Sequence, residues 1–295
     1  MNNKLKGTLL ILNAAFFFAV MNFLIKYAGN LPFFEKVIFR NMVSLFVAFI
    51  IIKRSHVKAF PSKQNFSLML TRVGFGTIGL FSNFYALDHL LIGDASMLSK
   101  ISPFSAMLFS FIFLREKVSP KQLLFTLGAF IGCAFVMKPS GDSSIFPALI
   151  GLLGGMSAGI AYTCVRGLGG RGVAGPTIVF DFALFSTLIA FPLFFLHYVS
   201  MSAIQLLILL SAGVCATIAQ FSLTLGYKCA PSREISIFDY TNVLFTAFLG
   251  FLFLAEIPDG WSLIGYGITF TMALLMFLSN KRDDQRERAL LNAHE

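Results

Sequence analysis

Long apolar segments separated by short polar stretches are the feature that most restricts how this chain can fold. A run of about 20 apolar residues is long enough to cross the hydrocarbon core of a bilayer as a helix. Ten such segments cover residues 7–26, 33–52, 67–87, 93–114, 121–138, 145–166, 176–198, 203–226, 233–255 and 260–279. Within them apolar and polar residues do not alternate strictly, so the pattern predicts an all-α membrane protein rather than a β-barrel.

The composition supports lipid as the main solvent of the protein. Hydrophobic residues make up 57% of the chain and charged residues 13%, with a mean hydropathy of +0.79. Soluble domains carry roughly 25% charged residues, so this chain could not cover a water-exposed surface. The first segment follows Lys4 and Lys6 like a signal peptide, but it has no convincing cleavage site and contains polar Asn22. We therefore expect it to remain in the mature protein.

The distribution of basic residues predicts the orientation of the segments. With a cytoplasmic N-terminus and ten spans, 17 of the 23 Lys and Arg residues fall on the cytoplasmic side. Only Lys26, Lys36 and Lys138 fall outside, and Arg40, Arg72 and Lys100 lie within spans. A miscounted span would reverse every later loop, so this bias favours ten spans with both termini in the cytoplasm. We expect the protein to lie in the cytoplasmic (inner) membrane. The net charge of +9 then reflects topology and predicts no nucleic-acid partner.

Two similar units follow each other along the chain. At an offset of 140 residues, the end of the first unit matches the end of the second: Phe111, Phe113, Leu114 and Glu116 correspond to Phe251, Phe253, Leu254 and Glu256. The same offset relates four further pairs, which are Lys26 and Arg166, Gly29 and Gly169, Asp94 and Glu234, and Ser96 and Ser236. The units cover residues 1–140 and 141–280, followed by a charged tail at 281–295 that we expect to be cytoplasmic. Each unit contains five spans, an odd number, so the second is predicted to be inverted relative to the first, an arrangement that is common in transporters.

One stretch of the sequence resembles a known family. Residues 86–137, beginning ALDHLLIGDASMLSKISPFSAML, are similar to the end of an EamA-type repeat of the drug/metabolite transporter superfamily. That repeat pairs a proline in its fourth helix, here Pro103, with a closing Leu-x-Glu, here Leu114 to Glu116. The second unit keeps Leu254 to Glu256 but has Val243 in place of the proline.

The resemblance implies a ten-helix carrier with a central cavity between two five-helix halves. Carriers of this group move amino acids, other metabolites or drugs, often outward. The sequence therefore predicts a secondary transporter of small polar metabolites, with amino acids or related amphoteric compounds preferred. Alternatives are a carrier for nucleosides, sugar derivatives or organic cations, and less favoured ones are a channel or a non-transporting membrane scaffold.

Ionisable residues within spans are the first candidates for contact with the cargo. Each costs roughly 2.5–3.5 kcal/mol at the bilayer centre on insertion scales, so such residues usually face a cavity or a partner. Lys100, with Arg40, would attract a carboxylate, while Asp239 would attract an ammonium group or carry a proton. At 1.5 Å per residue, Lys100 and Asp239 fall on opposite sides of the midplane, so no direct salt bridge between them is expected. The alternative is that these residues form structural pairs or extend towards the interface.

Neutral polar and aromatic residues complete the predicted lining. Tyr240, at the position equivalent to Lys100, and Asn242 would continue the polar surface from Asp239. Further candidates from other spans are Asn22, Asn83, Tyr85, Tyr162 and Gln220. Asp181 lies near the cytoplasmic end of its span and is expected to be solvated.

Glycines and one proline have a mechanical interpretation. Gly151, Gly155 and Gly159 form a smooth stripe that predicts close helix packing, and Gly128 and Gly132 repeat the spacing in the fifth span. The second stripe could serve internal packing or a homodimer. Pro103 is expected to kink the fourth span just past Lys100, because proline removes a helix hydrogen bond.

Several functions are excluded by the motifs that the sequence lacks. The four cysteines are scattered, without metal-ligand spacing, and no HExxH or Walker A pattern occurs. We expect no enzymatic activity, no metal and no cofactor. Transport coupled to protons is the one ion dependence that the sequence suggests. The expected partners are a small-molecule substrate and the lipid bilayer.

Overall fold

A computed structural model describes residues 3–114, 119–137, 145–229 and 235–292 of the chain. These residues form helices joined by short connections, and none of them is in a β-strand. The first unit contributes α1 (Asn3–Tyr27), α2 (Phe33–Ser55), α3 (Lys63–His89), α4 (Ile92–Ser99), α5 (Ser102–Leu114) and α6 (Pro120–Met137). The second contributes α7 (Ile145–Gly170), α8 (Gly175–Leu196), α9 (Ala203–Cys229), the 3₁₀ helix η1 (Ser236–Tyr240), α11 (Thr241–Leu254) and α12 (Gly260–Asn292).

Helices occupy all ten predicted segments, although not all of them are uniform apolar spans. Seven helices in the described part of the chain are long and apolar enough to cross a membrane. The other three segments differ for visible reasons: α2 and α3 carry several charged residues, and the fourth segment is divided into α4 and α5. The ninth segment is also irregular, because it begins as the 3₁₀ helix η1. Glu116 and Glu234, which belong to the sequence repeat, lie outside the described residues.

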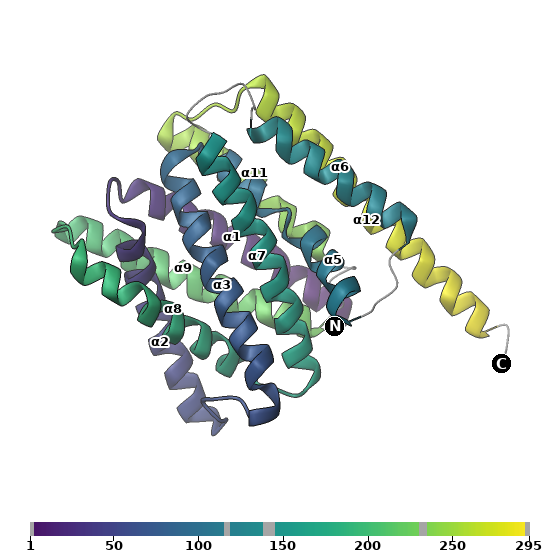
Figure 1. The fold of residues 1–295 in the computed structure, drawn as a ribbon, viewed down its shortest axis with the longest axis horizontal. Coiled ribbons are helices and arrows are strands. Elements are labelled where there is room, and N and C mark those ends of the chain that lie inside the picture. The colour runs from purple at the N-terminus through teal and green to yellow at the C-terminus, as the bar shows by residue number, and fades with distance from the viewer. Residues whose placement is uncertain (1–2, 115–118, 138–144, 230–234, 293–295) are drawn as a thin grey trace.

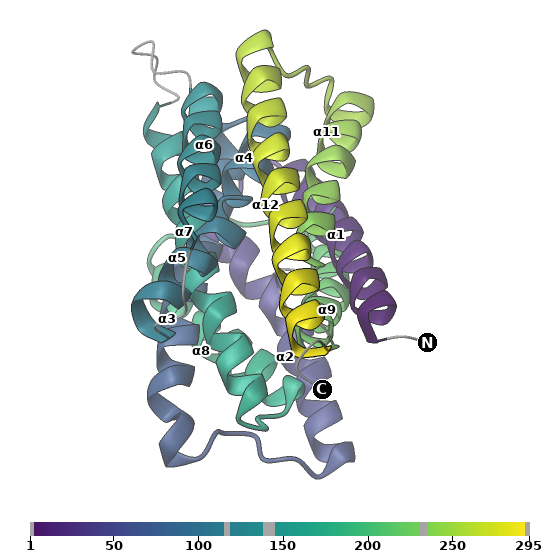
Figure 2. The same cartoon turned by 90° about the vertical axis from the view of Figure 1, so that its right-hand side faces the viewer.

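The helices pack as a bundle in which neighbours in space come from distant parts of the sequence. The most extensive contacts join α1 to α9, α3 to α7, α6 to α12 and α2 to α8, followed by α5 with α7, α2 with α9 and α1 with α11. Figure 1 shows α6 and α12 side by side along one edge of the molecule. In Figure 2 both chain ends lie towards the lower end, where the α2–α3 connection turns, while the α11–α12 connection lies at the top.

Small residues allow the close approach of α7 to the broken fourth segment. A side chain at Gly155 would overlap the backbone oxygen of Leu98, and one at Gly159 would overlap the backbone oxygen of Ser102. This confirms the packing role predicted for the stripe. In α6, side chains at Gly128 and Gly132 would collide with Met272 and Thr269 of α12, so this stripe is used within the chain.

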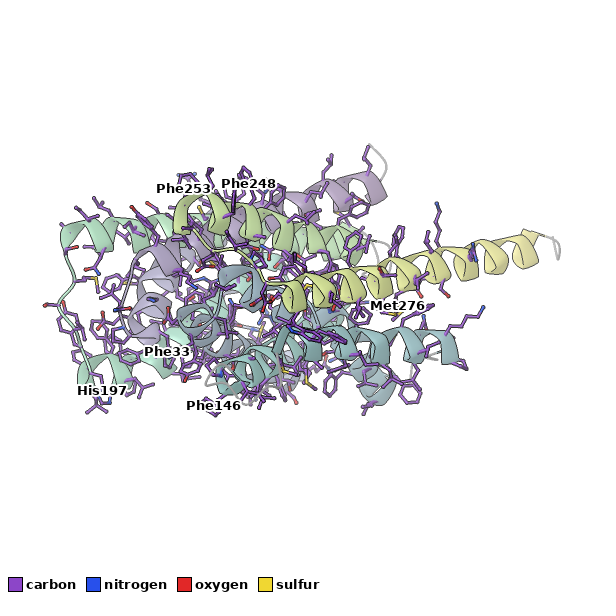
Figure 3. The ribbon with its side chains drawn as sticks, turned by 90° about the horizontal axis from the view of Figure 1, so that it is seen from above. Phe33, Phe146, His197, Phe248, Phe253 and Met276 are labelled. Atoms are coloured by element: carbon purple, nitrogen blue, oxygen red, sulfur yellow. The ribbon has the colours of Figure 1, made fainter. Side chains whose placement is uncertain are left out.

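The outer surface of the bundle is apolar, as contact with lipid requires. Phe146, Phe248 and Phe253 point away from the bundle (Figure 3) and are each more than half exposed. Burying polar groups and exposing apolar ones in this way is favourable only where the solvent is hydrocarbon. Figure 3 also shows the C-terminal part of α12 extending beyond the other helices, so the predicted charged tail continues this helix as far as Asn292.

Candidate functional site

The interruption between α4 and α5 places Lys100 in the interior of the protein. α4 ends at Ser99, the backbone turns at Lys100 and Ile101, and α5 begins at Ser102. Pro103 has no backbone N–H, so it cannot donate the bond that would continue the helix from Ser99. The kink predicted beside Lys100 is therefore present as a complete break. Lys100 is only 6% exposed, deep between α7 and η1.

Asp239 reaches Lys100 from the other half of the chain. The Nζ atom of Lys100 lies 2.8 Å from Oδ2 of Asp239, and both side chains are buried. The expectation that no direct salt bridge joins these residues was wrong. It treated both spans as straight helices with fixed ends, whereas α4 has only eight residues and η1 is a 3₁₀ turn, and the long lysine side chain bridges the remaining distance.

Tyr240 fixes the geometry of this ion pair. Its hydroxyl donates a hydrogen bond of 2.8 Å to the backbone oxygen of Lys100. This carbonyl lies at the helix break, where the regular pattern of backbone bonds is interrupted. Tyr240 was predicted to line the cavity; the structure places it, buried, directly behind Lys100. It therefore orients the main chain that carries the lysine.

The ion pair faces a cavity of about 120 Å³ between the helices of the two halves. Eight of the ten predicted site residues line it: Lys100, Asp239, Arg40, Asn242, Asn22, Tyr162, Asn83 and Gln220. They come from α1, α2, α3, α7, α9, α11, η1 and the α4–α5 break, so residues far apart in the sequence converge here. Phe18, Met21, Leu80 and Phe182 add an apolar surface.

Arg72 is a cavity residue that sequence reasoning missed. It lies in α3, is 2% exposed, and places its guanidinium carbon 4.3 Å from the ring centre of Phe182. It was predicted to lie within a span but was not included among the residues that contact the cargo. The signal that could have identified it is Gly76, one helical turn later, because a side chain there would overlap the Arg72 guanidinium.

Several buried polar atoms of the lining have no hydrogen-bond partner within the described part of the chain. The donors are Nε of Arg40, Nε of Arg72 and Nε2 of Gln220, and the acceptors are Oδ1 of Asn22, Oδ1 of Asn83 and Oδ1 of Asp239. Buried polar groups in folded proteins are almost always paired. A group of them converging on one cavity provides hydrogen-bonding groups of the kind that line sites for polar molecules.

A second group of charges lies at the end of the bundle where residues 28–32 and 255–259 connect their helices. We call it the end cluster; it consists of Lys26, Lys36, Asp88 and Glu256. Lys26 Nζ lies 2.8 Å from Glu256 Oε1, and Lys36 is paired with Asp88. Glu256 also accepts a hydrogen bond of 2.7 Å from the backbone N–H of Ile92. These contacts tie α1 and α4 to the α11–α12 connection.

Tyr85 belongs to the end cluster region rather than to the central cavity. It stacks on His89 with ring centres 4.2 Å apart and lines a hollow of about 460 Å³ beside Lys26 and Asp88. Its predicted position in the cavity was therefore wrong. Tyr85 follows the cavity residue Asn83 by two positions, about 200° around α3, so it points from a different face of the helix.

Asp181 also differs from its predicted environment. Asp181 was predicted to lie near the cytoplasm in a solvated position, but the residue is 0% exposed. The α2–α3 connection covers this part of α8, since Thr177 one turn earlier donates a hydrogen bond of 2.6 Å to the backbone oxygen of Lys58. Neither carboxylate oxygen of Asp181 has a partner among the described residues.

An all-helical bundle with an apolar exterior and, among the described residues, seven membrane-length helices around a buried polar cavity defines a multi-pass membrane protein. Comparison with known proteins gives the same class. Residues 5–138 match the model of the EamA-like transporter family. The chain is 31% identical over 279 residues to the pseudopaline exporter CntI of Pseudomonas aeruginosa strain UCBPP-PA14, covering 94% of this chain and 97% of that protein.

A more distant relative is the riboflavin transporter of Vibrio cholerae serotype O1, which is 24% identical over 294 residues, covering 97% of this chain and 98% of the relative. A solved structure superposes with a TM-score of 0.69 at 16% identity, covering 94% of this chain and 98% of that one, which shows the shared fold. The chain belongs to the EamA-like transporter family of the drug/metabolite transporter superfamily. It is a transporter and not an enzyme.

Proposed function

We propose that this protein is a secondary transporter that exports small amphoteric metabolites, amino acids or related compounds, by alternating access. The observation that carries the proposal is the Lys100–Asp239 ion pair, which presents both signs of charge to one cavity between the two halves of the chain. A zwitterion can replace each partner of such a pair: its carboxylate bonds Lys100 and its ammonium bonds Asp239.

The energetics of the pair suit a carrier. Breaking a buried ion pair leaves uncompensated charge, at a cost of several kcal/mol. A cargo that supplies the missing charges removes this cost, so the cavity can open the pair only when it is occupied. Export is the direction indicated by the name of the Pseudomonas aeruginosa relative, a pseudopaline exporter.

Inversion of the two units would provide the alternating mechanism. Its support is that equivalent helices make equivalent contacts. At the offset of 140 residues, α1 corresponds to α7, α9 to α3 and α11 to α5. The α1–α9 contact therefore corresponds to α7–α3, and the α1–α11 contact corresponds to α7 with the α4–α5 segment. All these pairs are in contact. Ser62 and Ser202, 140 residues apart, likewise precede α3 and α9.

The orientation in the membrane is proposed from the basic residues. Both chain ends lie towards one end of the bundle (Figure 2), which the charge bias assigns to the cytoplasm. The end cluster would then lie on the outer side of a cell's cytoplasmic membrane. Coupling to protons through Asp239 and assembly as a homodimer remain predictions.

A second candidate is a cargo with an aromatic ring system. Phe18, Tyr162 and Phe182 line the cavity, and aromatic side chains suit flat ring compounds. The name of the Vibrio cholerae relative is in line with this alternative. Flux measurements with cargo panels distinguish the two.

The test uses the full chain in proteoliposomes loaded with labelled amino acids, nucleosides, sugars, flavins or organic cations. Saturable counterflow of an amphoteric compound is expected, and Lys100→Ala should abolish it while the protein still inserts. Lys53→Ala is the matched control, because Lys53 is exposed at the end of α2. Intact flux through Lys100→Ala would refute the assigned role of the ion pair.

A further inference from the structure

The charges around the cavity do not balance. Arg40, Arg72, Lys100 and Asp239 line it, and Asp239 is already paired with Lys100. No carboxylate among the described residues lies within salt-bridge distance of Arg40 or Arg72. Within the described part of the chain, two guanidinium groups thus remain without a counter-charge in the interior of a membrane protein.

Neutral groups hold both guanidinium groups in place. Arg40 Nη1 donates a hydrogen bond of 2.7 Å to Oδ1 of Asn41, whose amide donates in turn to Ser186 at 2.8 Å. The Arg72 guanidinium lies over the ring of Phe182 and occupies the space that a side chain at Gly76 would need. These contacts orient the two arginines without neutralising them, and the Nε–H of each remains unpaired among the described residues.

A purely structural role accounts poorly for this arrangement. Arginines inside membrane proteins that serve packing usually pair with an acid or with backbone carbonyls, or extend their head groups to the interface. Arg40 and Arg72 are 3% and 2% exposed, so neither reaches the surface. Their burial costs several kcal/mol per charge unless an anion binds beside them.

We infer that the cargo carries at least two carboxylates, which bind Arg40 and Arg72 with Lys100 contacting one of them, together with an amine that binds Asp239. This inference rests on the proposed function and narrows its cargo to amino dicarboxylates and larger amino polycarboxylates. The planar guanidinium fork matches a carboxylate with two parallel hydrogen bonds. The unpaired oxygen of Asp239 and those of Asn22 and Asn83 accept hydrogen bonds, which suits an N–H group on the same molecule.

The volume of the cavity limits how such a cargo fits. A space of about 120 Å³ is smaller than the roughly 300–1,000 Å³ of drug-sized sites. It holds a compact amino dicarboxylate, or the charged end of a longer molecule. Phosphate esters and inorganic anions also bind arginine, but they do not use the acceptor side of the cavity.

The test measures thermal unfolding of the purified full-length protein in detergent. Probes are glutamate, 2-aminoadipate and an N-carboxyalkyl amino acid, each compared with the analogue in which one carboxylate is an amide, and with inorganic phosphate and sulfate. A ligand that binds the native state raises its unfolding temperature. We expect the carboxylates to bind about tenfold or more tightly than the amides, from one lost charge-assisted hydrogen-bond pair.

Arg72→Gln and Arg40→Gln should each abolish the preference for the second carboxylate while weak binding of the amide analogues persists. Arg54→Gln, at the exposed end of α2, should behave as the wild type. If Arg72→Gln does not fold, Gly76→Ala displaces the guanidinium while keeping its charge, with Gly74→Ala as control because a side chain at Gly74 meets open space. Gly76→Ala should also lose the preference.

Three results would overturn the inference: no stabilisation by any carboxylate, equal stabilisation by acid and amide, or equal stabilisation by inorganic phosphate. The proposed function fails separately. If flux of a neutral or cationic compound depends on Lys100, the transporter role stands and the dicarboxylate cargo falls. If the carboxylates bind through Arg72 but no compound is transported, the inference stands and the carrier role falls.

Discussion

At the end cluster, Lys26 is paired with Glu256 and Lys36 with Asp88, whereas in the central cavity Arg40 and Arg72 have no acidic partner among the described residues. The end cluster joins α1 and α4 to the α11–α12 connection, so its charges hold helices together. The cavity charges are oriented by an asparagine, a phenylalanine ring and a glycine, which hold them without neutralising them.

This difference separates two uses of charge in a membrane protein. Paired charges stabilise one arrangement of helices and must separate when that arrangement changes. Unpaired charges reduce stability and are retained where a ligand supplies the opposite sign. The Lys100–Asp239 pair lies between the two cases, since it is paired and yet lines the cavity. Substitutions in each group should therefore change stability in different directions.

The largest expected effect is at the buried pair. Lys100→Met leaves Asp239 buried without its partner, and we expect a loss of about 3–5 kcal/mol in unfolding free energy. The double variant Lys100→Met with Asp239→Leu should regain most of this stability but not transport. Thermal unfolding in detergent, combined with flux in proteoliposomes, measures both. A stable Lys100→Met single variant would show that the pair is not the closed, buried contact described here.

The opposite sign is expected at Arg72. Arg72→Met removes a buried charge that no described carboxylate neutralises, and a hydrophobic residue can contact the Phe182 ring in its place. Unfolding free energy in the absence of cargo should rise by about 1–4 kcal/mol, by analogy with hydrophobic replacements of buried charges. Arg54→Met is the control at an exposed site. Destabilisation by Arg72→Met would assign Arg72 to the structural group with the end cluster.

The sequence was sufficient to predict the class of this site but not its contacts. Spans read from hydropathy carried Lys100, Asp239 and Arg40 to the interior, because ionisable residues within apolar segments have few other places to go. The offset of 140 residues made Tyr240 the counterpart of Lys100 in the second unit, and the Tyr240 hydroxyl donates a hydrogen bond to the backbone oxygen of Lys100. Hydropathy does not report helix breaks, however. The 3₁₀ turn at Asp239 and the break at Lys100 therefore made the ion pair unpredictable by counting residues.

The depth estimate also failed at Asp181. This residue lies a few positions inside its predicted span, where a straight helix would leave it near the surface. Thr177 and the backbone at Lys58 extend the covered region beyond the apolar segments, and Asp181 becomes fully buried. Position along a span gives burial only when the connections are short and open. At the ends of spans, tertiary packing determines how buried a residue is.

A smaller effect is expected at the end cluster. Lys26 and Glu256 side chains are 20% and 14% exposed, so their pair is partly screened by solvent. Lys26→Ala should shift the equilibrium towards a form open at this end by about 1 kcal/mol, roughly fivefold in population. Labelling of a cysteine placed at Leu31, a buried residue in the lining of the hollow, should become faster, and high salt should have the same effect without the Lys26 substitution. Unchanged labelling would show that the pair does not restrain opening.

The smallest effect is expected for a polar contact near the opposite end of the bundle. Arg171 is exposed and its Nη1 lies 3.4 Å from Oδ1 of Asn65, a long hydrogen bond in contact with solvent. Arg171→Gln should change the unfolding free energy by less than about 0.5 kcal/mol, because exposed polar contacts contribute little. Labelling at Leu31 should also stay unchanged, since the contact joins α3 to the α7–α8 turn and not the elements of the end cluster. An effect on opening as large as that of Lys26→Ala would mean that charge anywhere on the bundle controls its conformation, and the end cluster would lose its distinct role.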